Sequence, residues 1–81
     1  MPVYRNTRRY YFDIVCAGRV VRDLIGVVCE SAEEALAEAA TAADEYAAEC
    51  FRRGEKLGLE EIVVRDGHKG EVGRIDLRDL H

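Results

Sequence analysis

Several residue types that small proteins use to anchor a core or a catalytic site are scarce in this chain. Its 81 residues include no Trp, one Pro, two Phe and two His. The core therefore has to rest on Val, Ile, Leu and Ala, with four Tyr as the remaining large rings. No apolar run approaches the roughly 18 residues of a membrane-spanning helix, so we expect no membrane partner.

Cysteine is too sparse for a disulfide framework. Only Cys16, Cys29 and Cys50 are present, which is an odd number, and no two of them have the C-x-x-C spacing of a zinc or redox motif. We interpret Cys16 and Cys50 as small buried hydrophobic residues. The polar N-terminal residues also lack the hydrophobic region of a signal peptide. The pattern predicts a reduced, cytoplasmic protein without a metal or another cofactor.

The charge balance is acidic but uneven along the chain. Twelve Lys and Arg stand against 16 Asp and Glu, which gives a net charge of −4. A nucleic-acid binder needs a cationic surface, so this balance disfavours nucleic acid as a partner. The acidic residues gather in the predicted helix, at Glu33, Glu34, Glu38, Asp44, Glu45 and Glu49. Basic residues gather before the first predicted strand, at Arg5, Arg8 and Arg9.

The length fits one domain, and a domain of this size buries only about 60% of the surface of its unfolded chain. We expect a basic N-terminal arm at residues 1–9 and a single α+β domain at residues 10–78.

A long helix over residues 31–53 is the clearest feature of the sequence. Ser31 is a good N-cap, and Glu34 completes a capping box three residues later. Gly54 suits the position just past the helix end. Apolar residues recur at helical spacing at Ala32, Leu36, Ala39, Ala43, Tyr46 and Cys50, and Ala35, Ala47 and Phe51 broaden this stripe.

The residues before the helix predict a β-hairpin. A first strand at residues 10–16 alternates Tyr10, Phe12, Ile14 and Cys16 with Tyr11, Asp13 and Val15. A tight turn at Ala17-Gly18 would return the chain as a second strand at residues 19–22. A competing register has a wider loop and returns at residues 24–29. We favour the tight turn, with residues 24–29 as an extended segment that leads into the helix.

Two further strands are predicted after the helix, at residues 61–65 and 71–77, joined by a glycine-containing hairpin loop at 66–70. Ile62, Val64, Ile75 and Leu77 should face the helix. The predicted order is β-β-α-β-β, with one long helix packed on a small, mainly antiparallel sheet. Tyr11, Val15, Val63 and Val72 should lie on the sheet face away from the helix.

Three short motifs resemble a bacterial family of domains of unknown function. They are Tyr10-Tyr11-Phe12-Asp13, an Asp-x-x-Gly segment from Asp23 to Gly26, and Val64-Arg65-Asp66-Gly67, with an Ala- and Glu-rich helix between the last two. The resemblance covers roughly residues 10–77 and implies a fold and a bacterial source. It implies no activity. Residues 4–9 are an addition, since such proteins usually start the first strand just after Met-Pro.

The clearest candidates for chemistry are Asp13 and Asp23, which could face each other across the first hairpin. Paired carboxylates can act as acid and base. We favour a structural interpretation, in which Asp13 alternates onto the face opposite Phe12 and Asp23 turns the chain before Gly26. There is no visible nucleophile–base pair and no glycine-rich phosphate loop before a helix. We therefore expect no enzymatic activity.

By elimination, the sequence favours a small non-enzymatic protein-interaction or regulatory module. Its partner would be another protein or a second copy of the chain. It would bind to the sheet face away from the helix or to an edge strand. The candidate partner-binding residues are Arg5, Arg8, Arg9, Tyr11, Val15, Val63 and Val72. The alternative is a nucleic-acid-associated protein that uses the basic arm. The arm could also dock on an acidic protein surface such as the Glu-rich helix of a second copy. We expect no small-molecule ligand.

Overall fold

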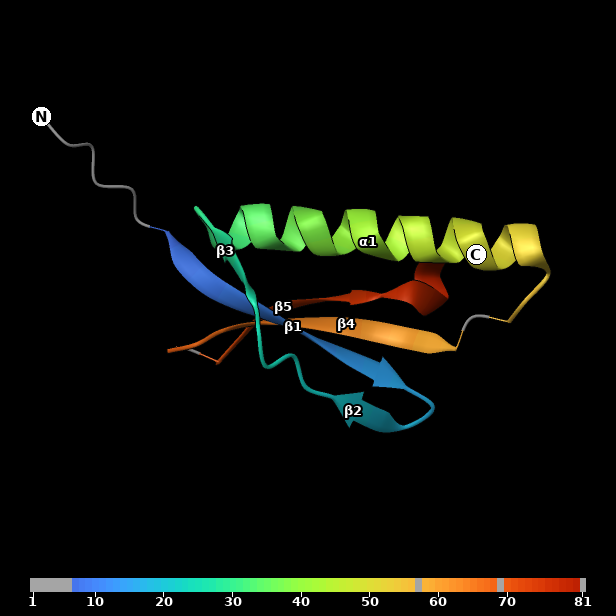
Figure 1. The fold of residues 1–81 in the computed structure, drawn as a ribbon, viewed down its shortest axis with the longest axis horizontal. Helices are drawn as coiled ribbons and strands as arrows, with labels where there is room; N and C mark the ends of the chain where they lie inside the picture. The colour runs from blue at the N-terminus through green and yellow to red at the C-terminus, as the bar shows by residue number, and fades with distance from the viewer. Residues whose placement is uncertain (1–6, 57, 69, 81) are drawn as a thin grey trace, which may run out of the picture.

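The computed structural model describes residues 7–56, 58–68 and 70–80. In these residues one helix lies along one face of a five-stranded antiparallel sheet (Figure 1). The elements are β1 (Arg8–Cys16), β2 (Arg19–Val21), β3 (Val27–Cys29), α1 (Ala32–Arg53), β4 (Leu59–Asp66), β5 (Gly70–Asp76) and a 3₁₀-helix, η1 (Leu77–Leu80). The predicted α+β class, with one long helix on a small antiparallel sheet, is confirmed.

Strand β1 supports two short strands on the same edge. The predicted tight turn is confirmed, because Val15 pairs with Val20 across Ala17-Gly18. The segment expected to be merely extended also contains a strand, since Tyr10 pairs with Val27. The order therefore gains β3 between the first hairpin and the helix. Strand β1 also begins two residues earlier than predicted, and this places Arg8 and Arg9 in the sheet.

Helix α1 begins and ends as its sequence predicts. The backbone N–H of Glu34 donates to Ser31 Oγ at 3.1 Å, and the Glu34 carboxylate accepts from the N–H of Glu30 at 3.0 Å. Gly54 terminates the helix in the left-handed conformation, with a φ of 69°. Among the described residues, no helix combines the length and the apolarity needed to cross a bilayer.

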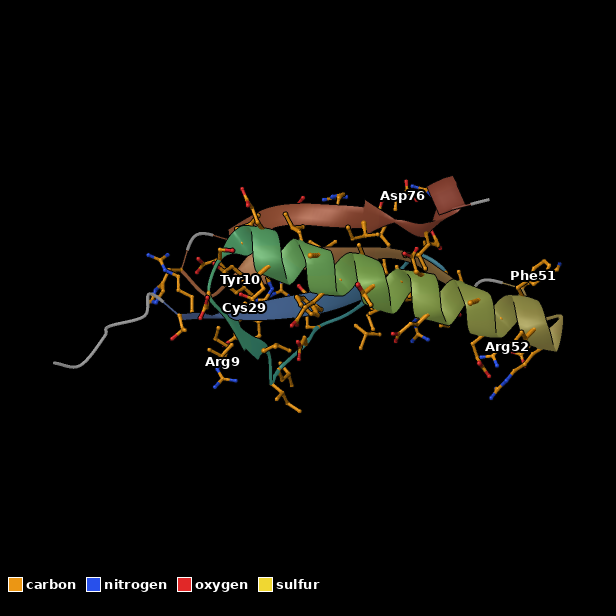
Figure 2. The ribbon with its side chains drawn as sticks, turned by 90° about the horizontal axis from the view of Figure 1, so that it is seen from above. Arg9, Tyr10, Cys29, Phe51, Arg52 and Asp76 are labelled. Atoms are coloured by element: carbon orange, nitrogen blue, oxygen red, sulfur yellow. The ribbon has the colours of Figure 1, made fainter. Side chains whose placement is uncertain are left out.

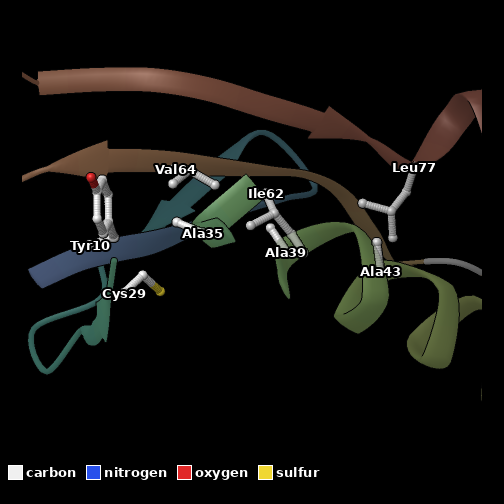
Figure 3. Close-up of a cluster of buried hydrophobic side chains, with 8 residues drawn as sticks. All are labelled: Tyr10, Cys29, Ala35, Ala39, Ala43, Ile62, Val64 and Leu77. Carbon is white, nitrogen blue, oxygen red and sulfur yellow. The ribbon is translucent and has the colours of Figure 1, made fainter. Parts of the chain in front are cut away.

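The core is thin because the helix presents alanine to the sheet (Figure 3). Its buried members are Tyr10, Cys29, Ala35, Ala39, Ala43, Ile62, Val64 and Leu77. Small side chains let α1 approach β4 and β5 closely. At Gly73 in β5 an added Cβ would lie 2.6 Å from a methyl carbon of Leu36. Cys50 is buried, as predicted for a small hydrophobic residue, while Cys16 is only half-buried; Cys29 is buried as well.

The prediction that Phe51 extends the apolar stripe of the helix is wrong. Its side chain is 87% exposed. Figure 2 shows Phe51 and Arg52 at the end of α1, past the strands that cover the rest of the helix. Cys50, the residue before Phe51, is 5% exposed, so the last turn still packs on one side and Phe51 lies on the side that faces solvent.

The predicted position of Val72 on the free sheet face is also wrong. Val64 pairs with Gly73 and Arg65 pairs with Glu71, which leaves Val72 as the extra residue of a β-bulge. A bulge changes the direction of the side chains that follow it. Val72 packs against the core cluster on the helix side instead.

Candidate functional site

Asp13, Asp23 and Arg65, one from each of the three motifs noted in the sequence, meet in one network. Arg65 Nε donates to Asp13 Oδ2 at 2.7 Å, and Arg65 Nη2 donates to Asp13 Oδ1 at 3.3 Å. The backbone N–H of Asp23 donates to Asp13 Oδ1 at 2.9 Å. Arg65 Nη2 also reaches the carbonyl oxygen of Asp23 at 3.4 Å. A bidentate ion pair thus joins β1, β4 and the segment that follows β2.

The Asp23 carboxylate fills a gap in the hydrogen bonding of the sheet edge. Strand β2 pairs with residues 14–16 of β1, and β3 pairs with residues 8–10. Between these stretches the N–H of Phe12 donates to Asp23 Oδ2 at 3.1 Å. Asp23 Oδ1 accepts from the N–H groups of Ile25 and Gly26, each at 3.0 Å. The Asp23 side chain therefore satisfies a backbone N–H of β1 and also fixes the loop between β2 and β3.

Gly26 completes this loop, and a side chain at its position would be strained and crowded. Its φ is +77°, in the left-handed region that favours glycine. An added Cβ would lie 2.8 Å from the carbonyl oxygen of Tyr10 and 2.8 Å from Arg9 Cγ. These contacts explain the Asp-x-x-Gly spacing. The Asp23 carboxylate accepts a hydrogen bond from the N–H of the residue three positions later, and that residue is glycine because its backbone passes close to β1.

Tyr11 is part of the same network. The Arg65 guanidinium lies over the Tyr11 ring, 4.7 Å from its centroid, which is a favourable cation–π distance. The two residues are cross-strand partners on the sheet face away from the helix. Tyr11 was predicted to bind a partner, but most of its surface is already covered and one ring face is occupied by Arg65.

The network keeps both carboxyl groups ionised. Burial alone would raise the pKa of Asp13, but the hydrogen bonds from Arg65 and from the N–H of Asp23 outweigh it and lower the pKa. Burial likewise opposes ionisation of Asp23, and the N–H groups of Gly26, Phe12 and Ile25 reverse this and lower its pKa. Neither group is held as a proton donor near neutral pH, so these contacts support the structural interpretation of the pair.

Acid should therefore destabilise the domain through Asp13 and Asp23. A carboxyl group whose pKa is lower in the folded state stabilises the fold above its unfolded pKa, about 3.9 for Asp. That contribution is lost as the pH falls through the lower folded pKa. We expect the free energy of unfolding in urea to fall as the pH is lowered from about 5 to about 3. Asp13→Asn, although less stable, should show a shallower pH dependence, and an unchanged slope would contradict the proposed ionisation.

Two residues of the predicted basic arm, Arg8 and Arg9, lie in the domain. Arg8 pairs with Asp66 at 3.2 Å, and Arg9 Nη1 donates to the carbonyl oxygen of Ile25 at 2.8 Å. Both arginines belong to β1, while Arg5 lies outside the described residues. The structure therefore uses Arg8 and Arg9 to hold the β4–β5 turn and the loop before β3.

The sheet face away from the helix is more polar than predicted. Val15 and Val63 do line it, in a shallow hollow shared with Asp13 and Arg65. Around them Arg74 pairs with Glu61 at 3.0 Å and with Glu71 at 2.6 Å. Since ion pairs cover so much of this face, it is a poor candidate for an apolar docking surface.

Apolar side chains are instead exposed along the edge formed by β2, the following loop and β3. We define this surface, the apolar edge, by Val20, Val21, Leu24, Ile25, Val27 and Val28. Leu24 is 87% exposed and Ile25 is 79% exposed. The sequence interpretation missed these residues. A signal was present in three adjacent apolar pairs, because a strand with one buried face alternates apolar and polar residues.

The opposite edge of the sheet, β5, is protected in the usual way. Its exposed Glu71 and Arg74 pair with each other, and its half-buried Asp76 pairs with Arg78 at 3.0 Å. Charged side chains on an edge strand discourage pairing with another chain. The contrast between the two edges makes the apolar edge the best candidate for a functional surface.

A buried thiol and two carboxylates meet where β3 contacts α1. Ligand atoms of Cys29, Glu34 and Glu38 lie within 4.8 Å of one another. Burial and the neighbouring carboxylates raise the pKa of Cys29, so the thiol keeps the proton that a metal ion would have to displace. Its sulfur lies 3.9 Å from Glu38 Oε2. The group acts as a polar contact between the strand and the helix.

The fold and site together define a small α+β domain in which a buried ion-pair network holds an exposed apolar loop. The chain belongs to the family described as Domain of unknown function (DUF6894), whose model matches residues 9–78. The predicted membership of a domain-of-unknown-function family is confirmed, and the match includes Asp13, Asp23 and Arg65. No curated protein and no solved structure matches the chain.

Proposed function

We propose that this protein is a non-enzymatic protein-interaction module that docks through the apolar edge. The observation that carries this proposal is the high exposure of Leu24 and Ile25 on a loop that Asp23 fixes through three backbone amides. Contiguous exposed apolar side chains on a small domain mark interaction surfaces. A loop that is already ordered loses little conformational entropy when it binds.

The proposal extends to the setting in which the protein works. The resemblance of its motifs points to a bacterial source, and its three free cysteines suit the reducing cytoplasm. The binding partner is a protein, and the module needs no metal or other cofactor for this role.

The nucleic-acid alternative has less support. Arg8 and Arg9 were its main candidates, and each already bonds within the protein, to Asp66 and to the Ile25 carbonyl. The Tyr11 ring, which would stack on a base, has Arg65 on one face. Binding to a phosphate backbone would have to compete with these contacts, and the net charge of −4 opposes it.

Crosslinking at Leu24 tests the proposal. A photoreactive amino acid at position 24 is expected to form covalent adducts with a protein in the native cell. The same amino acid at Glu71, on the charged edge, should form none. Adding Ile25→Glu to the position 24 variant should reduce the adducts by about tenfold or more, which is typical for loss of a central interface residue. Adducts no more abundant at 24 than at 71, or unaffected by Ile25→Glu, would refute the proposal.

A further inference from the structure

Two surfaces of the molecule carry exposed charges of opposite sign that take part in no ion pair. Among the described residues, Arg19 and Arg22 are exposed, take part in no ion pair and bracket Val20 and Val21 of the apolar edge in the chain. Arg22 also lines the hollow on the sheet face away from the helix, where its charge acts on Asp13. Acidic side chains of α1 are unpaired in the same sense, namely Glu33, Glu38, Asp44 and Glu45. Basic side chains therefore adjoin the β2 part of the apolar edge, and acidic side chains lie along the outer face of the helix.

The outer face of α1 contains a shallow hollow among these acidic side chains. It is lined by the small side chains of Ala37, Thr41 and Ala42 and by the acidic side chains of Glu34, Glu38 and Glu45. The hollow thus combines small side chains with acidic walls. The apolar edge has the opposite character, because the exposed Leu24 and Ile25 follow the exposed Arg19 and Arg22 in the chain.

We propose that the occupant of the apolar edge is a second copy of this chain, a step that rests on the proposed function. Leu24 and Ile25 of one copy dock in the α1 hollow of the other. Arg19 and Arg22 then face the acidic walls of that hollow. Pairing two apolar edges with each other would instead bring these arginines against their own copies, where like charges repel.

This contact joins two different surfaces of the same chain. If both copies use their edge and their hollow at once, a closed dimer forms. If only one contact forms per pair, the free edge and the free hollow recruit further copies into a chain. In both arrangements, a copy with a blocked edge keeps its hollow, and a copy with a blocked hollow keeps its edge. A mixture of the two therefore retains one complete edge-to-hollow contact per pair.

That property gives a complementation experiment. Ile25→Glu blocks the edge, and Ala42→Arg blocks the hollow. In analytical ultracentrifugation the wild-type protein should self-associate, and each variant alone should bind itself about tenfold or more weakly, as expected for loss of an interface anchor. An equal mixture of the two variants should form a 1:1 heterodimer. Ala48→Arg is the matched control, because Ala48 is an exposed alanine of α1 that does not line the hollow, and it should associate like the wild type.

The outcomes separate this inference from the proposed function. A wild type that associates, with a variant mixture that stays monomeric, overturns the edge-to-hollow contact. A wild type that stays monomeric at every concentration, while position 24 crosslinks to a different protein in cells, overturns the second copy as occupant and leaves the docking function in place. Crosslinks from position 24 to residues 37–45 of another copy would support both.

Discussion

Replacing Asp13 by Ala is expected to lower the free energy of unfolding by about 3 kcal/mol. Breaking a buried ion pair by removing one partner costs roughly 3–5 kcal/mol, because a charge is left without compensation. Asp13 is 4% exposed and accepts from both Arg65 and the backbone of Asp23. A domain of this size has only about 5 kcal/mol of stability or a little more, so the variant should be close to unfolding.

Urea denaturation followed by circular dichroism measures this loss. Glu71→Ala is the matched control, since it also removes one partner of an arginine ion pair on a strand, but at an exposed site. Its stability should stay close to that of the wild type. Adding Arg65→Met to Asp13→Ala should recover part of the loss, because the uncompensated charge is then removed. Equal stabilities for Asp13→Ala and Glu71→Ala would contradict the structural role of the network.

Gly26→Ala is expected to destabilise the domain by about 2 kcal/mol or more. A left-handed backbone costs a non-glycine residue on the order of 1–3 kcal/mol. The new Cβ would also lie 2.8 Å from the carbonyl oxygen of Tyr10, which is backbone and cannot move aside without disturbing β1. The amide of Gly26 would then be displaced from the Asp23 carboxylate.

Gly18→Ala separates the cost of a left-handed backbone at Gly26 from the cost of its close contact with Tyr10. Gly18 has nearly the same φ, +75°, but no atom lies within 4 Å of the position that its Cβ would take. It should therefore lose only the conformational part, about 1 kcal/mol. Thermal or urea unfolding of the two variants side by side provides the comparison. If Gly18→Ala is as harmful as Gly26→Ala, the close approach to β1 is not what requires glycine.

The helix could be predicted from the sequence because its signals are local. Ser31, Glu34 and Gly54 lie within a turn of the helix ends that they define, and each was interpreted correctly. The buried positions also follow from spacing, because Ala39 and Ala43 lie one turn apart on the same face. The failure at Phe51 has a different origin, since Phe51 lies at the margin of the apolar stripe, where the helix faces solvent although the neighbouring Cys50 is buried.

The strands were harder to predict because their positions depend on distant partners. The bulge that turns Val72 inward arises in the pairing of β4 with β5, and no neighbouring residue signals it. Strand β3 exists because Val27 reaches the far end of β1, past a loop whose shape Asp23 sets. Propensity alone reads that segment as extended, so the predicted β-β-α-β-β order lacked one strand.

The network was visible in the sequence only as separate motifs. Asp13 and Arg65 are 52 residues apart, and nothing local says that they meet. Asp23 and Gly26 were correctly interpreted as a turn, yet the contact with Phe12 depends on where β2 stops and β3 begins. The apolar edge was missed for a related reason. Adjacent pairs such as Leu24-Ile25 resemble core segments until the sheet places them on an unpaired edge.

The ordering of residues 24–26 tests most directly whether the network presents the apolar loop. Backbone ¹⁵N relaxation should give order parameters near 0.85 for Leu24, Ile25 and Gly26 in the wild type, as for a rigid backbone. In Asp23→Ala the same amides should fall below about 0.6 while the amides of α1 stay rigid. Order parameters already below about 0.6 in the wild type, or unchanged by Asp23→Ala, would contradict the account.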